Sequence, residues 1–240
     1  MLFGSKKKNN RSHSDGDIRS QICENLHFNA AEQYKLLRTN LMFTLPENVK
    51  CPVIGVTSSI RGEGKTTTAI NLSYVYSEIG KRVLLIDGDL RLPSVAKKLK
   101  IQNSPGVTNC LLGGESVSLS EFKSDIRSNW FIIPSGQLPP NPSELLASKK
   151  MENFLAMMSE HFDYIIVDLP PVNIVSDAIA ISQYLTGMIL VLKENYTDKR
   201  EFESCKRQLK LSNVKVLGTV MTNADSQKSH YKKYKGSYTY

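Results

Sequence analysis

The sequence predicts an α/β fold in which a mostly parallel sheet is covered by helices on both faces. Six apolar runs of strand length recur along the chain, at 53–57, 83–86, 130–133, 164–167, 188–192 and 214–221. Helical stretches lie between most of them, at 65–79, 143–160, 176–185 and 198–211. Strands that are apolar throughout and alternate with helices indicate a parallel sheet that is buried on both sides.

The chain of 240 residues is long enough to bury one substantial core, so we expect one domain, over residues 28–224. Residues 1–27 are polar and charged and are predicted to be a flexible arm. A helix at 30–43, with Asn29 as its candidate N-cap, is expected to open the domain. Residues 225–240 have no core-forming pattern and are predicted to be a flexible tail.

The net charge of +8 is concentrated at the two ends of the chain. Residues 1–20 hold five basic side chains against two acidic ones, and residues 225–240 hold four against one. The rest of the chain is close to neutral, which argues against a basic nucleic-acid-binding face. No apolar run approaches the roughly 20 residues that span a bilayer. The first residues lack a signal-peptide pattern, and the four cysteines lack zinc-ligand or disulfide spacing.

The segment VIGVTSSIRGEGKTT at 53–67 indicates a phosphate-binding loop, or P-loop. An apolar strand leads into a glycine-containing loop and then into a helix that begins with Lys65 and Thr66. Loop amides and the helix N-terminus bind phosphates, the lysine reaches the terminal phosphates, and the threonine hydroxyl ligates Mg²⁺. Ser59 stands where the first glycine of the motif is usual. The candidate ATP-binding residues here are Ser59, Ile60, Arg61, Gly62, Glu63, Gly64, Lys65, Thr66 and Thr67.

Two further strands end in carboxylates. VLLIDGDLR at 83–91 presents Asp87 and Asp89, and YIIVDLPP at 164–171 presents Asp168. Ligands of α/β proteins bind at the carboxyl ends of the strands, where these side chains are expected to meet the P-loop. We assign Asp87 and Asp168, with Thr66, to Mg²⁺ and its waters, and Asp89 to the role of candidate base. There are two alternatives. Asp87 and Asp89 exchange these roles, or the acids are ordinary residues of turns without a role in the site.

These three motifs resemble the Walker A, Walker A′ and Walker B motifs of the bacterial tyrosine kinases of capsule and exopolysaccharide synthesis. The resemblance covers residues 28–240 and includes GQLPPNPSELL at 136–146. The chain is also similar to the deviant-Walker ATPases of partition and cell division. Their signature lysine lies five positions before the P-loop lysine, where this chain has Ile60, and Arg61 beside it does not fit that pattern.

The resemblance to the tyrosine kinases implies further site residues. Lys65, Asp87 and Asp89 would be catalytic, and Asn223 would contact the adenine of ATP. The tail would be autophosphorylated on a cluster of four tyrosines, Tyr231, Tyr234, Tyr238 and Tyr240. The alternative for these tyrosines is an aromatic tail that docks on its own domain or on a partner. Glu32, Lys35 and Arg38 resemble an oligomerisation motif, in which Lys35 replaces an arginine, but they also fit an exposed helix face with charge pairs.

Three functions are therefore compared. The first is a kinase that uses ATP and Mg²⁺ to phosphorylate tyrosines, mainly on its own tail and between chains of a homo-oligomer, for which the resemblance implies a ring. By resemblance it would act with a membrane-bound adaptor at the inner face of the cell membrane, phosphorylate other proteins, and regulate polysaccharide synthesis. The second is a partition-type ATPase switch. The third is a regulator that binds nucleotide but has no catalytic activity. The intact residues of the three motifs argue against this third function.

Overall fold

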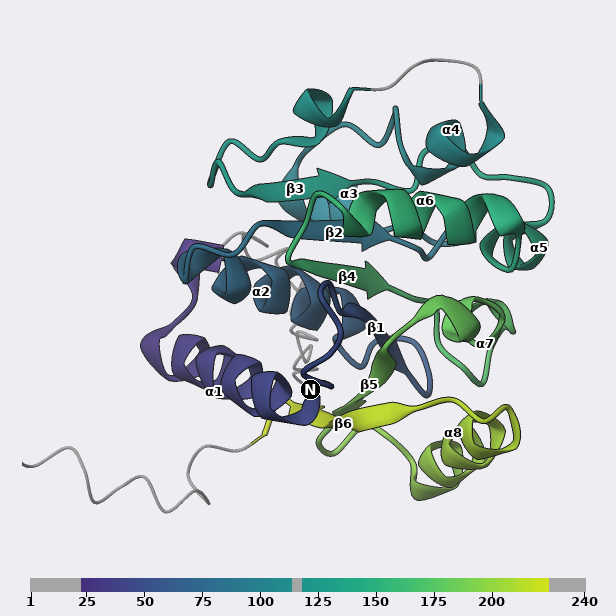
Figure 1. The fold of residues 1–240 in the computed structure, drawn as a ribbon. Coiled ribbons are helices and arrows are strands. Elements are labelled where there is room, and N and C mark those ends of the chain that lie inside the picture. Colours follow the sequence, from purple (N-terminus) through teal and green to yellow (C-terminus); the bar gives the residue numbers. More distant parts are fainter. Residues whose placement is uncertain (1–22, 114–117, 225–240) are drawn as a thin grey trace, which may run out of the picture.

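The computed structural model describes residues 23–113 and 118–224. One six-stranded sheet forms the centre of the fold (Figure 1). All strand pairs are parallel, and the strand order is β3-β2-β4-β1-β5-β6. The strands are β1 Val53–Ser58, β2 Val83–Asp87, β3 Trp130–Ile133, β4 Tyr164–Asp168, β5 Gly187–Lys193 and β6 Val216–Thr222. The predicted fold class is confirmed, because each predicted apolar run forms a strand of one parallel sheet.

Helices and 3₁₀ turns occupy most of the connections between the strands. They are η2 Cys23–Asn25, α1 Phe28–Thr44, α2 Lys65–Glu78, α3 Val95–Leu99, α4 Val107–Leu112, η3 Leu119–Phe122, α5 Pro142–Leu146, α6 Lys149–Ser159, α7 Asp177–Ile181, η4 Ser182–Tyr184 and α8 Lys199–Leu211. Two predicted helices are wrong in their extent. The stretch 143–160 is divided because Ser148 caps a new helix by accepting a hydrogen bond from the Met151 amide. The stretch 176–185 tightens into a 3₁₀ turn after Ile181.

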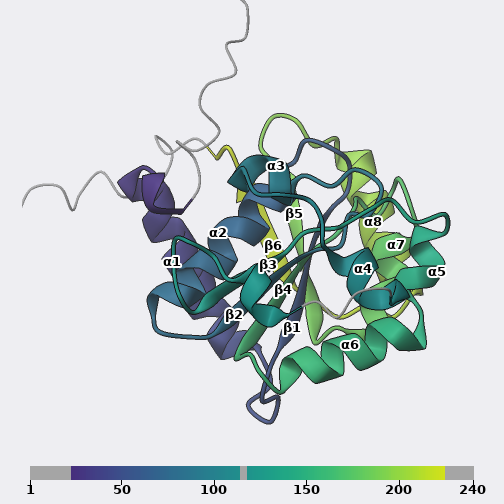
Figure 2. The ribbon, with the colours of Figure 1, turned by 90° about the horizontal axis from the view of Figure 1, so that it is seen from above.

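The helices cover both faces of the sheet (Figure 2). Side chains alternate along each strand, so that Ile54 and Val56 pack with α1 and α2 while Val53 packs on the opposite side, with α6 and α8. In β2 the same alternation places Leu85 on the side of Ile54 and Leu84 on the side of Val53. This burial on both faces is the physical reason why the strands read as continuous apolar runs. Helix α1 begins at Phe28 with His27 at the N-cap position, so the predicted cap at Asn29 is wrong.

The strand order brings the sequence motifs together. Strand β4 lies between β1 and β2, and its last residue, Asp168, is in register with Val56 of β1 and Asp87 of β2. The P-loop follows β1 directly, so the carboxylates at the ends of β4 and, one strand further, β2 lie near it at the carboxyl edge of the sheet. The site is thus a consequence of topology.

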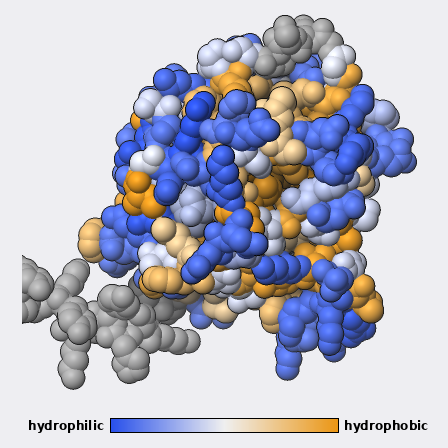
Figure 3. Space-filling model, viewed as in Figure 1, coloured by the Kyte–Doolittle hydropathy of each residue, from blue (hydrophilic) through white to orange (hydrophobic). Residues whose placement is uncertain are grey.

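Most of the surface seen in Figure 3 is hydrophilic, and apolar residues gather in smaller patches. Within the part of the chain that the structure describes, no helix combines the length and the apolar character that a membrane span requires. The predicted tail at 225–240 and residues 1–22 of the predicted arm lie outside the described residues. Of the rest of that arm, Cys23–Asn25 form a 3₁₀ turn.

Candidate active site

The P-loop adopts the backbone conformation that its glycines permit. Gly62 and Gly64 have φ angles of +84° and +96°, in the left-handed region where a side chain is strained. A Cβ atom on Gly62 would lie 2.8 Å from the hydroxyl oxygen of Tyr196. Gly64 precedes α2, and the loop therefore ends at the N-terminus of a 14-residue helix, a position that favours anions.

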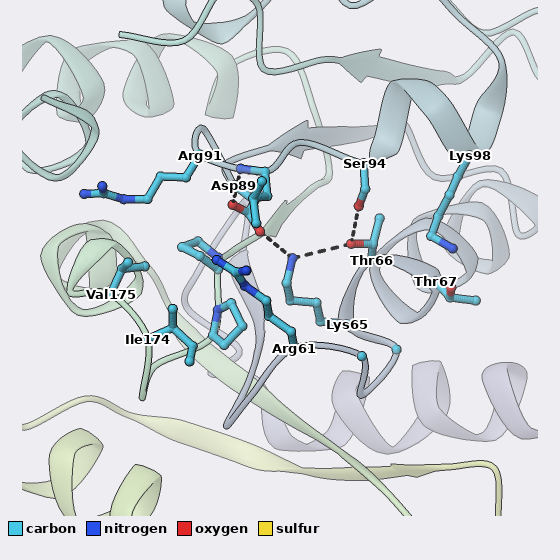
Figure 4. A pocket seen from close by; sticks show the side chains of 15 residues that line it. Arg61, Lys65, Thr66, Thr67, Asp89, Arg91, Ser94, Lys98, Ile174 and Val175 are labelled. Carbon is cyan, nitrogen blue, oxygen red and sulfur yellow. Dashed lines mark hydrogen bonds and ion pairs between the residues drawn. The ribbon is translucent and has the colours of Figure 1, made fainter. Parts of the chain in front are cut away.

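Lys65 lies at the centre of the site. Its Nζ is 2.8 Å from Oδ2 of Asp89 (Figure 4). It also lies 3.6 Å from Oδ1 of Asp168. Burial alone would lower the pKa of Lys65, but the carboxylates of Asp168 and Asp89 outweigh burial and raise it. The ammonium group is therefore charged at neutral pH and available to phosphate oxygens.

Asp168 is fully buried and has one oxygen engaged and one without a hydrogen bond. Its Oδ2 accepts a hydrogen bond of 2.6 Å from the Thr66 hydroxyl, while Oδ1 has no hydrogen-bond donor among the described residues. Burial raises the pKa of Asp168, and Lys65 and Thr66 oppose the rise. A carboxylate oxygen beside a threonine hydroxyl fits a hard divalent cation. Because no three His, Cys, Asp or Glu side chains in the described ranges are arranged to hold a metal ion by themselves, nucleotide oxygens and waters would complete its coordination.

Asp87 holds the loop that follows β2. Its Oδ2 accepts hydrogen bonds from the amides of Ser94 (3.1 Å) and Val95 (3.0 Å), and its Oδ1 accepts one from the amide of Asp89 (3.2 Å). Burial, with a contribution from the Asp168 carboxylate, raises the pKa of Asp87 to about 7. Both oxygens of Asp87 therefore position backbone, and its predicted role at the metal stays a prediction.

Asp89 reaches the cavity that Lys65 faces. One of its oxygens pairs with Lys65, and the other accepts a hydrogen bond of 3.1 Å from the amide of Leu92. The cavity has a volume of about 380 Å³. Its lining comprises Arg61, Gly62, Gly64, Lys65, Thr66, Thr67, Asp89, Arg91, Leu92, Ser94, Lys98, Pro170, Pro171, Ile174 and Val175.

Three residues that sequence reasoning did not single out organise this site. Glu63, predicted only as a member of the loop, is fully buried, and its carboxylate accepts hydrogen bonds from Ser59 (2.7 Å), the Ile60 amide (2.9 Å) and the Thr197 hydroxyl. Arg91 of the DGDLR segment donates two hydrogen bonds, of 2.8 Å and 3.1 Å, to buried Asp177 at the start of α7. The interaction links the loop after β2 to a segment 86 residues away in sequence.

Asn223 and the oligomerisation motif lie outside the cavity lining. Asn223 directly follows β6 and has a φ angle of +56°; its contact with adenine stays a prediction. The Lys35 ammonium is 2.8 Å from the Glu32 carboxylate, and Arg38 donates to the backbone carbonyl of Val75 in α2. These contacts lie within one chain. The four predicted phosphorylation sites in the tail lie outside the described residues.

Comparisons with known proteins agree with this geometry. The sequence model of the AAA domain family matches residues 51–199. Tyrosine-protein kinase CpsD of Streptococcus pneumoniae serotype 4 is 38% identical over 203 residues, which cover 84% of this chain and 88% of that protein. Tyrosine-protein kinase YwqD of Bacillus subtilis is 36% identical over 205 residues, which cover 85% and 86%.

Solved structures point to the same family. The kinase domain of Escherichia coli tyrosine kinase ETK superposes with a TM-score of 0.73 at 29% identity and covers 84% of this chain and 80% of that one. The chimerical protein CapA2B2 gives a TM-score of 0.73 at 30% identity, with 79% and 83% covered. The septum site-determining protein MinD of Pyrococcus horikoshii, complexed with Mg-ADP, shares the fold at 22% identity, a TM-score of 0.58 and coverage of 71% and 70%.

The matching fold implies that the site binds a nucleotide together with a divalent metal ion, for which Lys65, Thr66 and Asp168 supply suitable groups. The identities above 30% extend over most of both chains. This chain therefore belongs to the family of bacterial tyrosine-protein kinases, and it is a protein-tyrosine kinase built on a P-loop fold.

Proposed function

We propose that this kinase transfers the γ-phosphate of ATP to tyrosines of its own C-terminal tail, between chains, with Mg²⁺ as the metal. The acceptors are the four tyrosines at positions 231, 234, 238 and 240. The observation that carries the proposal is the meeting of Lys65, Asp89 and the Thr66–Asp168 pair at one cavity. Cation, candidate base and metal-binding oxygens are the groups that phosphoryl transfer to a hydroxyl requires.

Each of these groups has a separate role in the proposal. Lys65 neutralises the terminal phosphates, and Asp89 accepts the proton of the tyrosine hydroxyl. Thr66 and Asp168 would hold Mg²⁺, which supplies charge neutralisation on the phosphates when bound. Asp87 keeps Ser94 and the loop after β2 in place through its backbone hydrogen bonds.

The position of β6 supports the tail as substrate. The hydroxyl of Thr222, its last residue, donates a hydrogen bond of 2.7 Å to the carbonyl of Glu63 in the P-loop. Strand β6 therefore ends beside the P-loop, and an extended chain of the 16 residues at 225–240 would span at most about 55 Å. This reach includes the site of a neighbouring chain as well as its own. Assembly through α1, with Glu32, Lys35 and Arg38, would raise the concentration of the neighbour's tail.

Phosphorylation would reverse the charge of the tail. Each phosphate adds about −1.5 to −2 charges, so that a tail with a charge of +3 becomes strongly negative. Repulsion from Asp89, Asp168 and the nucleotide would then release it. We further propose that a membrane-bound adaptor activates the kinase at the inner face of the cell membrane, and that the cycle regulates capsular or exopolysaccharide synthesis. The similarity to the chimerical protein CapA2B2 supports the proposal that a second protein acts together with the kinase.

A mixing experiment tests transfer between chains. A Lys65→Met subunit, which keeps its tyrosines, is combined with an active subunit that lacks residues 228–240, and both receive Mg·ATP. Phosphotyrosine on the Lys65→Met tail, measured by mass spectrometry, is the expected result. The matched control is a Lys65→Met subunit whose four tail tyrosines are phenylalanine. If folded, associated subunits yield no tail phosphate, transfer between chains is refuted.

The alternative is an ATPase switch of the partition or cell-division type. It rests on a shared fold at 22% identity and on no site residue specific to it, since Ile60 occupies the position of the signature lysine. Such a switch would hydrolyse ATP without forming phosphotyrosine, so the same mass-spectrometric assay separates the two functions.

A further inference from the structure

The lining of the cavity combines polar and apolar side chains. Thr66, Thr67, Ser94 and Lys98 contribute hydroxyl and ammonium groups. Leu92, Pro170, Pro171, Ile174 and Val175 contribute apolar groups. Figure 4 shows Ile174 and Val175 on the opposite side of Lys65 from Thr67 and Lys98. The hydroxyl and ammonium groups suit the phosphates, whereas the apolar side chains do not bind them. Arg61 and Arg91 also line the cavity, on the same side of Lys65 as Ile174 and Val175 (Figure 4).

Ile174 and Val175 lie on the same side of Lys65 as the candidate base Asp89, from which we expect the acceptor to approach (Figure 4). The lysine of a P-loop reaches the terminal phosphates, so the γ-phosphate is expected at Lys65. An acceptor oxygen attacks from the far side of that phosphate, close to the candidate base Asp89. Leu92 lies next to this base, because the Leu92 amide donates a hydrogen bond of 3.1 Å to the Asp89 carboxylate.

Leu92 and Ile174 both line the cavity, together with charged side chains, and are 52% and 47% exposed. Exposed apolar side chains in such a place indicate a binding surface for an apolar group. The ring of a tyrosine combines a large apolar face with a hydroxyl at its tip, so it can cover this surface while its oxygen reaches the phosphate. A serine or threonine hydroxyl lies one bond beyond Cβ, and the substrate backbone would have to enter the cavity.

The surface is held in place before any substrate binds. The amide of Asn173 donates to the carbonyl of Ser59 in the P-loop (3.2 Å), and the Asn173 side chain donates to Glu201 of α8 (2.7 Å). The amide of Val175 donates to the carbonyl of Pro171 (3.3 Å). These bonds couple the apolar surface to the phosphate-binding loop, and such preorganisation favours orientation of a reactant.

We propose that Leu92, Ile174 and Val175 form the subsite for the aromatic ring of the acceptor tyrosine and select tyrosine over serine and threonine. The proposal rests on the tyrosine-kinase activity and is independent of whether the tail is the substrate.

The test measures phosphorylation of a synthetic ten-residue peptide with a single central tyrosine by the full chain. Ile174→Ala is expected to raise the KM for the peptide about tenfold, as removal of apolar contact area in a specificity pocket does, and to leave the Kd for Mg·ATP unchanged. Ile174→Leu, which keeps the apolar volume, should restore the KM. Ile126→Ala is the matched control, because Ile126 is 43% exposed and precedes β3 at the other end of the sheet.

Competition with unreactive peptides adds a readout of ring recognition. The same peptide with phenylalanine should inhibit the wild-type chain competitively, while the peptide with serine should not. Ile174→Ala should weaken inhibition by the phenylalanine peptide in parallel with the KM. An unchanged peptide KM in folded Ile174→Ala, or equal inhibition by the serine and phenylalanine peptides, would overturn the proposal. Absent tail phosphate with normal peptide kinetics would refute only transfer to the tail.

Discussion

Replacement of Glu63 tests whether its buried carboxylate holds the P-loop in its binding conformation. The two oxygens accept hydrogen bonds from Ser59, Ile60 and Thr197. In Glu63→Gln an NH₂ group replaces one of the oxygens. Beside the Ile60 amide it would meet another donor, and beside Thr197 it would leave that hydroxyl hydrogen without its acceptor. A buried donor left unpaired costs about 1–3 kcal/mol, and a hydrogen bond to a charged group contributes about 1.5–3 kcal/mol. We therefore expect the free energy of unfolding to fall by about 2–4 kcal/mol.

Urea unfolding measures this loss, and titration calorimetry with Mg·ATP measures its effect on binding. The affinity should fall in proportion to the fraction of chains that keep the binding conformation of the loop. Glu160→Gln, at the exposed residue that directly follows α6, is the matched control and should change neither quantity. Wild-type stability together with wild-type affinity in Glu63→Gln would refute the reasoning.

Two further predictions concern the carboxylates. Asp89→Asn should slow phosphoryl transfer about 10²–10⁴-fold while calorimetry shows nearly unchanged Mg·ATP affinity; loss of metal-dependent binding would instead exchange the roles of Asp87 and Asp89. Because the pKa of Asp87 is raised from 3.8 to about 7 in the folded chain, the folded state binds more protons between these values. Without nucleotide and metal, stability should therefore fall by up to about 4 kcal/mol between pH 4 and 7. Thermal unfolding would show this slope, flattened in Asp87→Asn, and a flat wild-type profile would contradict it.

The sequence was sufficient to predict the sheet and the meeting of its motifs. Strands such as VLLI and YIIV are apolar on both faces, and only a parallel sheet between helices buries such runs. Asp168 could be placed beside the P-loop because strand ends gather at one edge of a parallel sheet. Helix limits were less accurate, since Ser148 interrupts the stretch 143–160 through a local side-chain cap that periodicity does not reveal.

Contacts between distant segments could not be predicted from one sequence. The pairing of Arg91 with Asp177 depends on the packing of α7 against the loop after β2. The burial of Glu63 depends on Thr197, which follows β5 and lies 134 residues away. The exposed positions of Leu92 and Ile174 at one cavity likewise follow from the fold, because nothing in either local sequence marks the residue as a neighbour of the other.

We expect Lys65 to bind the phosphates that this kinase transfers to tyrosine. The direct test compares the wild-type chain with Lys65→Met after incubation with Mg·ATP, with phosphotyrosine counted by mass spectrometry and folding checked by circular dichroism. We predict phosphotyrosine on the wild-type tail and none on folded Lys65→Met. Near-normal phosphotyrosine formation by a folded Lys65→Met chain would contradict the assignment of the site.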